Sequence, residues 1–275
     1  MAGLSFCSIL EASKERFLQI LGNYRWLNPH LSLSLQWDRQ RLLMAEATDP
    51  RWRKWIPSDP TSPHWYDEAR FERYIAAHVA RDQDLGRDRK VREFITEFRG
   101  FSGTAKQKLV QEETGTGRMS LSAMFDSNGQ IDRDLAARLL AALRQHSRPV
   151  KPRDLGVIGR DHLFQCLREN GGKEETLKYQ SFLGVNETDG LPYVVETAFG
   201  WCPDGVDRRH IVVGLNWSVA LGNPFRSLGG PWGRSLDSIL TEQRAGEDEP
   251  IVIAVHYASP RVEYTDRGKS AAVIR

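Results

Sequence analysis

The segment that most restricts the fold lies near the end of the sequence, where an apolar run leads into a glycine- and lysine-containing loop. Residues 250–260 read PIVIAVHYASP, a pattern typical of a strand buried in a sheet. The loop that follows ends in Gly268, Lys269 and Ser270. This order suggests a Walker phosphate loop, but that motif requires glycine at position 263, where the sequence has Glu263. Lys269 therefore needs another interpretation.

Other segments indicate that the terminal strand belongs to a sheet accompanied by helices. Strands are predicted at 191–199 and 210–219, and a helix at 236–244 separates the second of these from the terminal strand. A further short helix is predicted at 161–170. Strands that alternate with helices favour a layered α/β or α+β arrangement, and the fold class that we expect is α+β.

The opening of the chain combines a helix and a strand. Apolar residues recur at helical spacing over 9–21, and strict alternation over 31–37 predicts a strand with one buried face. A helix and one strand cannot bury themselves, so we expect this piece to need strands that the chain does not contain. Prolines then mark 49–63 as an extended connector.

A helical block follows the connector. Helices are predicted at 66–80, 89–98, 103–113 and 131–146. Seven basic side chains gather around its middle: Arg87, Arg89, Lys90, Arg92, Arg99, Lys106 and Lys108. Such a cluster, with glycines that can expose helix amides, suits contact with DNA phosphates. The alternative is a solvated helix face, because several glutamates dilute the charge.

Composition excludes several classes of protein. The 275 residues suffice for roughly two domains, and 27% charged with 40% apolar residues is typical of globular chains. A net charge of +2 gives the whole molecule no strong attraction to nucleic acid. The three cysteines form no Cys-x-x-Cys pair, and the seven histidines show no metal-ligand spacing. No apolar run could span a membrane and no basic leader opens the chain, so we expect a cytoplasmic protein.

Two further groups of residues read as structural. His256 falls within the terminal strand, and we expect it to be a satisfied core or edge residue. Glu187, Asp189 and Glu196 could be imagined as paired carboxylates, but nothing in the sequence fixes them on one face. We therefore predict no catalytic residue.

Several segments, in collinear order, resemble the B subunit of DNA topoisomerase VI, a type IIB enzyme. Residues 28–30 followed by a strand resemble the close of its GHKL ATPase domain, and 63–98 together with 103–106 resembles its helix-two-turns-helix insert. Residues 152–159 resemble the link to the transducer domain, and 190–200 its first long strand. The strand and loop over 251–269 resemble its switch-lysine element.

The resemblance implies a division into four parts. These are a GHKL remnant at 1–45, a helix-two-turns-helix block at 46–115, a helical linker at 116–160 and a transducer domain of ribosomal S5-like fold at 161–275. Lys269 then becomes the residue that contacts the γ-phosphate of ATP, against the alternative of a solvated loop lysine. The implied function is coupling of ATP binding to DNA strand passage by a partner A-like subunit, within a possible homodimer.

The departures from that family are equally informative. The early Glu/Asn helix and the Asp-x-Gly-x-Gly turn that bind ATP are missing, and the nearest imitation starts at Asp154 in the linker. We therefore expect the interior of a B subunit, cut at both ends. ATP and Mg²⁺ bind only if the missing half is supplied, and the chain alone neither hydrolyses ATP nor relaxes DNA. The alternatives are a non-enzymatic DNA-binding or scaffold module and a fragment without activity.

Overall fold

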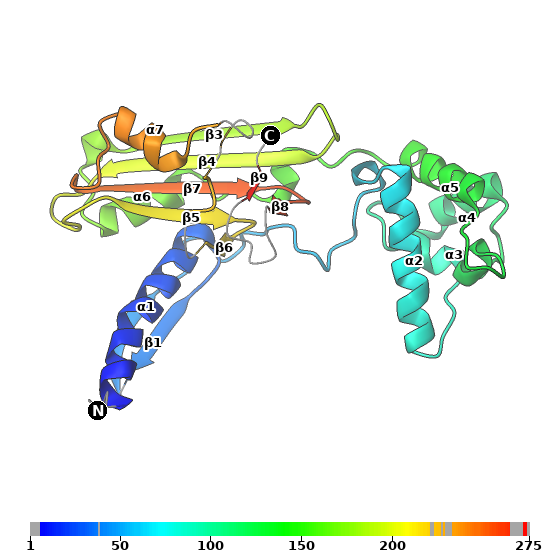
Figure 1. Ribbon diagram of the computed structural model, residues 1–275, viewed down its shortest axis with the longest axis horizontal. Coiled ribbons are helices and arrows are strands. Elements are labelled where there is room, and N and C mark those ends of the chain that lie inside the picture. The colour runs from blue at the N-terminus through cyan, green and yellow to red at the C-terminus, as the bar shows by residue number, and fades with distance from the viewer. Residues whose placement is uncertain are drawn as a thin grey trace. The chain divides into compact units, whose positions relative to one another are not determined.

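The computed structural model describes residues 6–37, 39–220, 223–226, 228, 233–264 and 272–273. The chain forms two compact units. Unit 1 combines the described parts of 1–54, 152–185 and 192–275, and unit 2 comprises 55–151 with 186–191. Helices and strands are both well represented, so the fold class is α+β, as predicted (Figure 1). The four-part division implied by the family resemblance stays a prediction.

A five-stranded sheet forms the centre of unit 1, with the strands in the order β3-β4-β7-β5-β6 (Figure 1). The long strand β7 lies antiparallel to β4 on one side and parallel to β5 on the other. In β4 buried residues alternate strictly with half-buried ones, so every second side chain points into one layer. The strands are β3 (Lys178–Val185), β4 (Pro192–Trp201), β5 (His210–Leu215), β6 (Ser218–Val219) and β7 (Ile251–Ala258).

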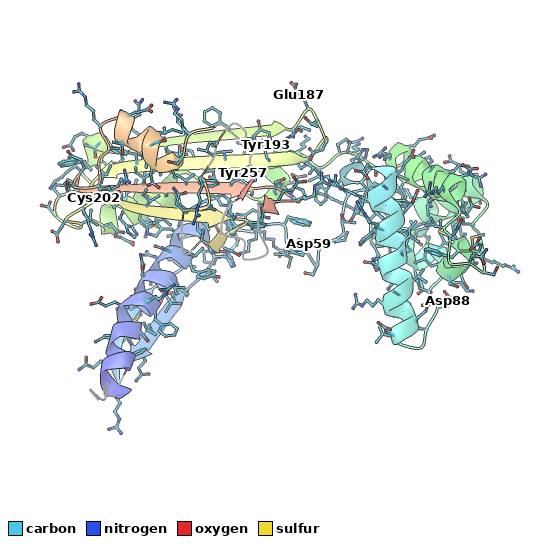
Figure 2. All side chains as sticks on the ribbon, viewed as in Figure 1. Asp59, Asp88, Glu187, Tyr193, Cys202 and Tyr257 are labelled. Atoms are coloured by element: carbon cyan, nitrogen blue, oxygen red, sulfur yellow. The ribbon has the colours of Figure 1, made fainter. Side chains whose placement is uncertain are left out.

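Helices and hairpins complete unit 1. Its helices are α1 (Phe6–Leu27), α6 (Arg160–Glu169) and α7 (Leu236–Glu242), with short 3-10 turns at Pro152–Leu155 and Glu174–Thr176. Two further pairs of strands are β1 (Leu33–Trp37) with β2 (Gln40–Ala45), and β8 (Glu263–Tyr264) with β9 (Ala272–Val273). Tyr193 lies near the start of β4, and Cys202 directly follows its last residue (Figure 2). The thiols of Cys166 and Cys202 are both buried and free.

The expectation that the opening piece depends on strands outside the chain was wrong. Helix α1 packs on β5 and β6 of the same chain. Its last residue, Leu27, is fully buried against Gly214 of β5, where a Cβ would come within 2.4 Å of the leucine side chain. The predicted strand at 31–37 pairs with β2, which the sequence pattern did not reveal. Glycine at position 214 therefore creates the space in which the opening helix is anchored.

Unit 2 is helical, as predicted. Its elements are a 3-10 turn (Pro63–Trp65), α2 (Glu68–Asp84), α3 (Val91–Ile95), α4 (Thr104–Thr114), a 3-10 turn (Leu121–Met124) and α5 (Arg133–Gln145). Asp67 and Asp132 cap the first turns of α2 and α5 by accepting backbone hydrogen bonds. Gly115 ends α4 in the left-handed region at φ 72°. The buried core is built around Phe71, Phe94 and Phe98.

Two strand predictions needed correction. The segment expected as one strand at 210–219 is a hairpin, because Asn216 and Trp217 both take positive φ (48° and 61°) between β5 and β6. Strand β3 was not predicted at all. The strand lies at the edge of the sheet. Two consecutive residues within it, Phe182 and Leu183, are both exposed, so it lacks the alternation that marks a half-buried strand.

None of the described helices is long and apolar enough to cross a lipid bilayer.

Substitution Phe94→Ala tests the core of unit 2. Phe94 is fully buried and its ring contacts those of Phe71 and Phe98, so truncation leaves a cavity. We expect the stability of unit 2 to fall by about 3–5 kcal/mol, measured by native-state hydrogen exchange at the amides of α5. Leu109→Ala, at a side chain that is 41% exposed, is the matched control and should change stability by less than about 0.5 kcal/mol. Equal effects of both substitutions would contradict the assigned core.

Candidate functional site

Lys269, the predicted phosphate-contacting residue, lies outside the described residues. The strand that leads toward it is described, and β7 occupies the middle of the sheet between β4 and β5. The prediction that this strand is buried is confirmed, since six of its eight residues are buried. Each of those six has at most 6% of its surface exposed. The role assigned to Lys269 stays a prediction.

The seven predicted DNA-contacting residues divide by exposure. Arg89 is buried, with 6% of its surface accessible. The others are exposed on unit 2: Arg87, Lys90, Arg92, Arg99, Lys106 and Lys108. Six of the seven predicted residues therefore lie at the surface of this unit, and the seventh is buried inside it.

Arg89 is the centre of an ion-pair network. Its guanidinium donates to Asp82 through Nε and Nη2, and its Nη1 donates to Glu97 Oε1 at 2.8 Å. Arg87 Nε donates to the same Asp82 carboxylate at 2.8 Å. The hydrogen bond from Arg89 is the largest influence that lowers the pKa of Asp82 well below its usual range. Arg89 thus connects the end of α2 to the residues that flank α3, and its guanidinium is too deeply buried to meet a phosphate.

Three of the exposed cations are oriented by neutral partners. Lys90 Nζ donates to Ser120 Oγ at 2.9 Å, and Arg92 Nε donates to Gln107 Oε1 at 3.0 Å. Lys106 Nζ donates to the His146 carbonyl at 2.8 Å. A hydroxyl, an amide or a carbonyl directs a cation without cancelling its charge, so these hydrogen-bond partners leave the three side chains charged. Asp88, on the loop before α3 (Figure 2), accepts a hydrogen bond from the Ser122 hydroxyl at 2.7 Å.

The most unusual group in unit 1 is a buried carboxylate at the middle of the sheet. Glu196 on β4 is 1% exposed and faces His256 directly across the β4–β7 pair. Its Oε2 accepts from Ile158 N at 2.8 Å and lies 3.2 Å from His256 Nδ1. Its Oε1 accepts from Gly159 N and from the Tyr179 hydroxyl, each at 2.8 Å. One carboxylate therefore joins β3, β4, β7 and the segment that enters α6.

These contacts determine the ionisation of the group. Burial opposes a charge on Glu196, but the hydrogen bond from His256, the charge of His256 and the two backbone donors outweigh it. The net effect lowers the pKa of Glu196 below its ordinary value. Burial, together with the neighbouring Glu196 charge, raises the pKa of Tyr179, so the phenol stays a proton donor to the carboxylate.

A second cluster of polar and aromatic side chains adjoins His256. The Trp217 ring lies 5.5 Å from the His256 ring and 6.3 Å from that of Trp52. Lys54 Nζ lies 5.8 Å from the Trp217 ring and donates to the side-chain carbonyl of Asn28, whose Nδ2 donates to the Trp217 backbone. Burial lowers the pKa of Lys54. The cluster fixes the β5–β6 turn to the end of α1.

Sequence reasoning set Glu196 aside, and the structure explains why. Glu187 and Asp189, considered with it as possible partners, lie exposed in the loop between β3 and β4 (Figure 2 shows Glu187). The observed partners are the backbone at residues 158 and 159, the Tyr179 hydroxyl and a histidine 60 residues away. The available signal was register, because Glu196 stands at an inward position between Val194 and Ala198. His256 is buried, as predicted, and its Nδ1 faces Glu196. The expectation that it is fully satisfied was wrong, because its Nε2 has no partner among the described residues.

Within the described ranges no three His, Cys, Asp or Glu side chains gather as a metal site would require. The buried Glu196 group can hold segments together and respond to protons, but it offers no open face to a substrate. No protein-family model matches the chain. No curated protein matches it either.

Substitution Glu196→Gln tests the buried carboxylate. An amide has an NH₂ group in place of one carboxylate oxygen. In one orientation this group faces Ile158 N and His256 Nδ1, and in the other it faces Gly159 N and the Tyr179 hydroxyl. Two buried donors lose their acceptor, so we expect a loss of about 3–5 kcal/mol in the free energy of unfolding at neutral pH. Glu187→Gln, on the exposed loop, is the control and should be neutral.

The same variant has a pH signature. The pKa of Glu196 is lowered on folding, so its contribution is complete above the unfolded value of about 4.3 and is lost as pH falls through the folded value. Wild-type Tm should therefore fall more steeply than that of Glu196→Gln between about pH 5 and pH 3. Parallel curves for the two proteins would contradict an ionised Glu196.

Proposed function

We propose that the chain is a DNA-contacting coupling subunit of a topoisomerase VI-like assembly. Unit 2 contacts duplex phosphates, unit 1 acts as the transducer, and strand cleavage belongs to an A-like partner subunit. The observation that carries the proposal is the set of six exposed cations on unit 2, three of which are directed by neutral groups. The order of elements that resembles the topoisomerase VI B subunit supports the transducer role.

Contact with DNA follows from the chemistry of these side chains. Lys90, Arg92 and Lys106 are exposed, and each donates one hydrogen bond to a neutral group, so further N–H donors remain for a phosphate. Gly103 begins α4 without a side-chain cap, which leaves first-turn amides available to the same phosphate backbone. Such contacts are independent of sequence and give affinity that falls with salt. Unit 2 is accordingly proposed to bind the DNA backbone without contacting base edges.

The coupling step is proposed to run through the Glu196 carboxylate. It joins β7, the strand that leads toward Lys269, to the backbone at Ile158 and Gly159, just before α6. A displacement at the end of β7 would thus reach the linker segment through buried hydrogen bonds. In this proposal Lys269 contacts the γ-phosphate of ATP, with ATP and Mg²⁺ held by a GHKL half that another polypeptide supplies.

A non-enzymatic DNA-binding or scaffold module is the second candidate. The exposed cations of unit 2 favour it, because they need no nucleotide to bind DNA. The two candidates separate on partners. Co-purification of an A-like subunit, with ATP-dependent strand passage on adding a GHKL half, supports coupling; DNA binding without such a partner supports the module.

The salt dependence of DNA binding tests the shared part of both candidates. We expect the triple variant Lys90→Gln, Lys106→Gln, Lys108→Gln to bind duplex DNA of any sequence more weakly. Its slope of log affinity against log salt should be shallower by up to about 3, measured by fluorescence anisotropy.

The matched control removes three exposed positive charges from unit 1, with Lys178→Gln, Arg208→Gln and Arg226→Gln. Its salt slope should equal that of the wild type. Equal loss in both triple variants would mean that net charge alone governs binding, and no loss in the unit 2 variant would overturn the proposal.

A further inference from the structure

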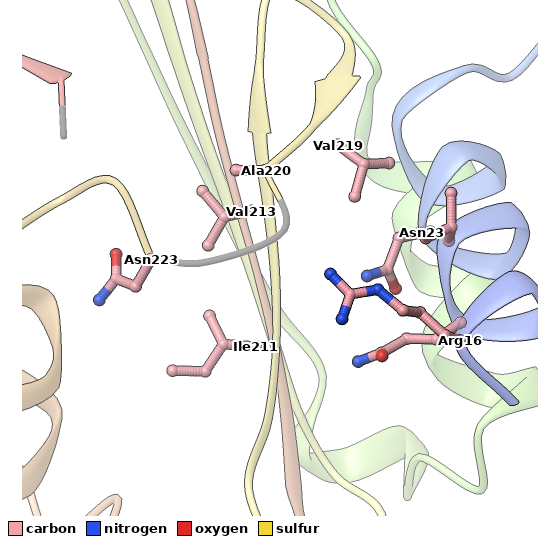
Figure 3. A pocket seen from close by; sticks show the side chains of 9 residues that line it. Arg16, Asn23, Ile211, Val213, Val219, Ala220 and Asn223 are labelled. Atoms are coloured by element: carbon pink, nitrogen blue, oxygen red, sulfur yellow. The ribbon is translucent and has the colours of Figure 1, made fainter. Parts of the chain in front are cut away.

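The two edges of the central sheet of unit 1 differ in how they are protected. At one edge β6 comprises only two residues, Ser218–Val219, and helix α1 packs on it. Figure 3 shows this edge from close by, with Val219 on the same side of the sheet as Asn23 of α1. At the other edge β3 pairs with β4 along all eight of its residues, and no described strand pairs with its outer side (Figure 1). β3 is therefore the open edge of the sheet.

This open edge lacks the features that normally prevent strands of different molecules from pairing. Edge strands usually carry charges, proline or a bulge. Residues 179–185 read YQSFLGV, without charge or proline, and their register with β4 runs without a shift. Three apolar side chains of β3 are left in solvent: Phe182 is 58% exposed, Leu183 42% and Val185 52%. Exposed apolar residues on an unpaired strand mark a surface that another strand can cover.

The backbone of Trp201 shows which groups of β3 point outward. Its C=O accepts from Lys173 N at 2.8 Å, and its N–H donates to Thr176 Oγ1 at 3.0 Å, so both groups turn toward the segment that leads into β3. In an antiparallel pair this direction alternates along each strand. The β3 residues that bond to β4 are therefore Lys178, Gln180, Phe182 and Gly184. The β3 residues that turn their backbone N–H and C=O groups outward are Tyr179, Ser181, Leu183 and Val185.

We propose that two copies of the chain pair through β3 and join their sheets across a twofold axis at Phe182. The pairing is antiparallel, so Ser181 lies opposite Leu183 of the second copy, and Tyr179 lies opposite Val185 of the second copy. Every outward N–H then meets an outward C=O. Registers centred on Ser181 or on Leu183 would leave one outward residue without a partner in β3. The register centred on Phe182 is therefore the one that completes the ladder.

The side chains of β3 suit a second copy as the occupant of this edge. The two Phe182 rings meet across the axis on one face, and Tyr179 meets Val185 on the other. Aromatic–aromatic and aromatic–β-branched pairs of this kind stabilise neighbouring strands. The one charged residue of β3, Lys178, lies at its end, so antiparallel pairing keeps the two lysines far apart. A net charge of +2 gives the two copies little mutual repulsion.

The size of the interface sets the affinity that we expect. One pair of strands with its side chains buries less than about 1,200 Å² in total, which is typical of transient complexes. The Kd of the dimer is accordingly expected between about 1 and 100 µM. The interface lies wholly within unit 1, so this inference is independent of DNA contact by unit 2.

Analytical ultracentrifugation of the full-length protein tests the pairing. The wild type should change from monomer to dimer as its concentration rises through the expected Kd. Phe182→Glu places like charges directly opposite each other at the axis and should weaken the dimer by at least about tenfold. Met44→Glu, at a side chain that is 61% exposed on β2, is the matched control and should leave the dimer unchanged. A wild type that stays monomeric up to about 1 mM, or a dimer that Phe182→Glu does not weaken, would overturn the proposal.

Cysteine cross-linking tests the register. The background is Cys7→Ser, because the other two cysteines are buried. Phe182→Cys places two thiols opposite each other at the axis, within reach of a disulfide. Gln180→Cys is the matched control, because it lies on the same face of β3 but opposite Gly184 of the second copy. We expect oxidation to give a covalent dimer with Phe182→Cys and none with Gln180→Cys. Equal cross-linking of both variants, or none in either, would contradict the assigned register.

Discussion

The ionised Glu196 carboxylate is the interaction on which the arrangement of unit 1 depends. A buried charge is costly unless every lone pair finds a donor, and this one meets two backbone N–H groups, a phenol and a histidine. The donors come from segments far apart in the sequence, so the carboxylate fixes register between β4 and β7 and also fixes the backbone that starts α6. Hydrophobic burial alone would specify neither with the same accuracy.

Unit 2 uses charge in two different ways. Its interior holds one compensated network, in which Arg89 is surrounded by Asp82 and Glu97, and this network connects α2 to α3. Its surface holds cations that are steered by neutral oxygens and so remain available to an anion. Basic residues that are adjacent in sequence therefore have different roles: Arg89 stabilises the interior of unit 2, and Lys90 lies at its surface. Burial decides between them, since a charge inside must be paired where one outside need not be.

The sequence predicted elements whose signal is local. The helix of α5 was expected at 131–146 and occupies Arg133–Gln145, because its apolar period and its Asp132 cap agree. Features that depend on contacts between distant residues were not predicted. The pairing of Glu196 with His256 follows from the register of β4 and β7, which the sequence does not specify. The burial of Arg89 likewise depends on its contact with Asp82 in the folded chain. Edge strand β3 escaped because its exposed Phe182 and Leu183 erase the alternation that predicts strands.

Hydrogen exchange at the amides of Ile158 and Gly159 tests the central claim most directly. If the buried Glu196 carboxylate holds this segment, both amides exchange as slowly in the wild type as those of β4 and β7. In Glu196→Gln they then exchange faster by at least about 100-fold, while the amides of α5 in unit 2 keep their rates. Rapid exchange at both amides in the wild type, or unchanged rates in the variant, would contradict the account.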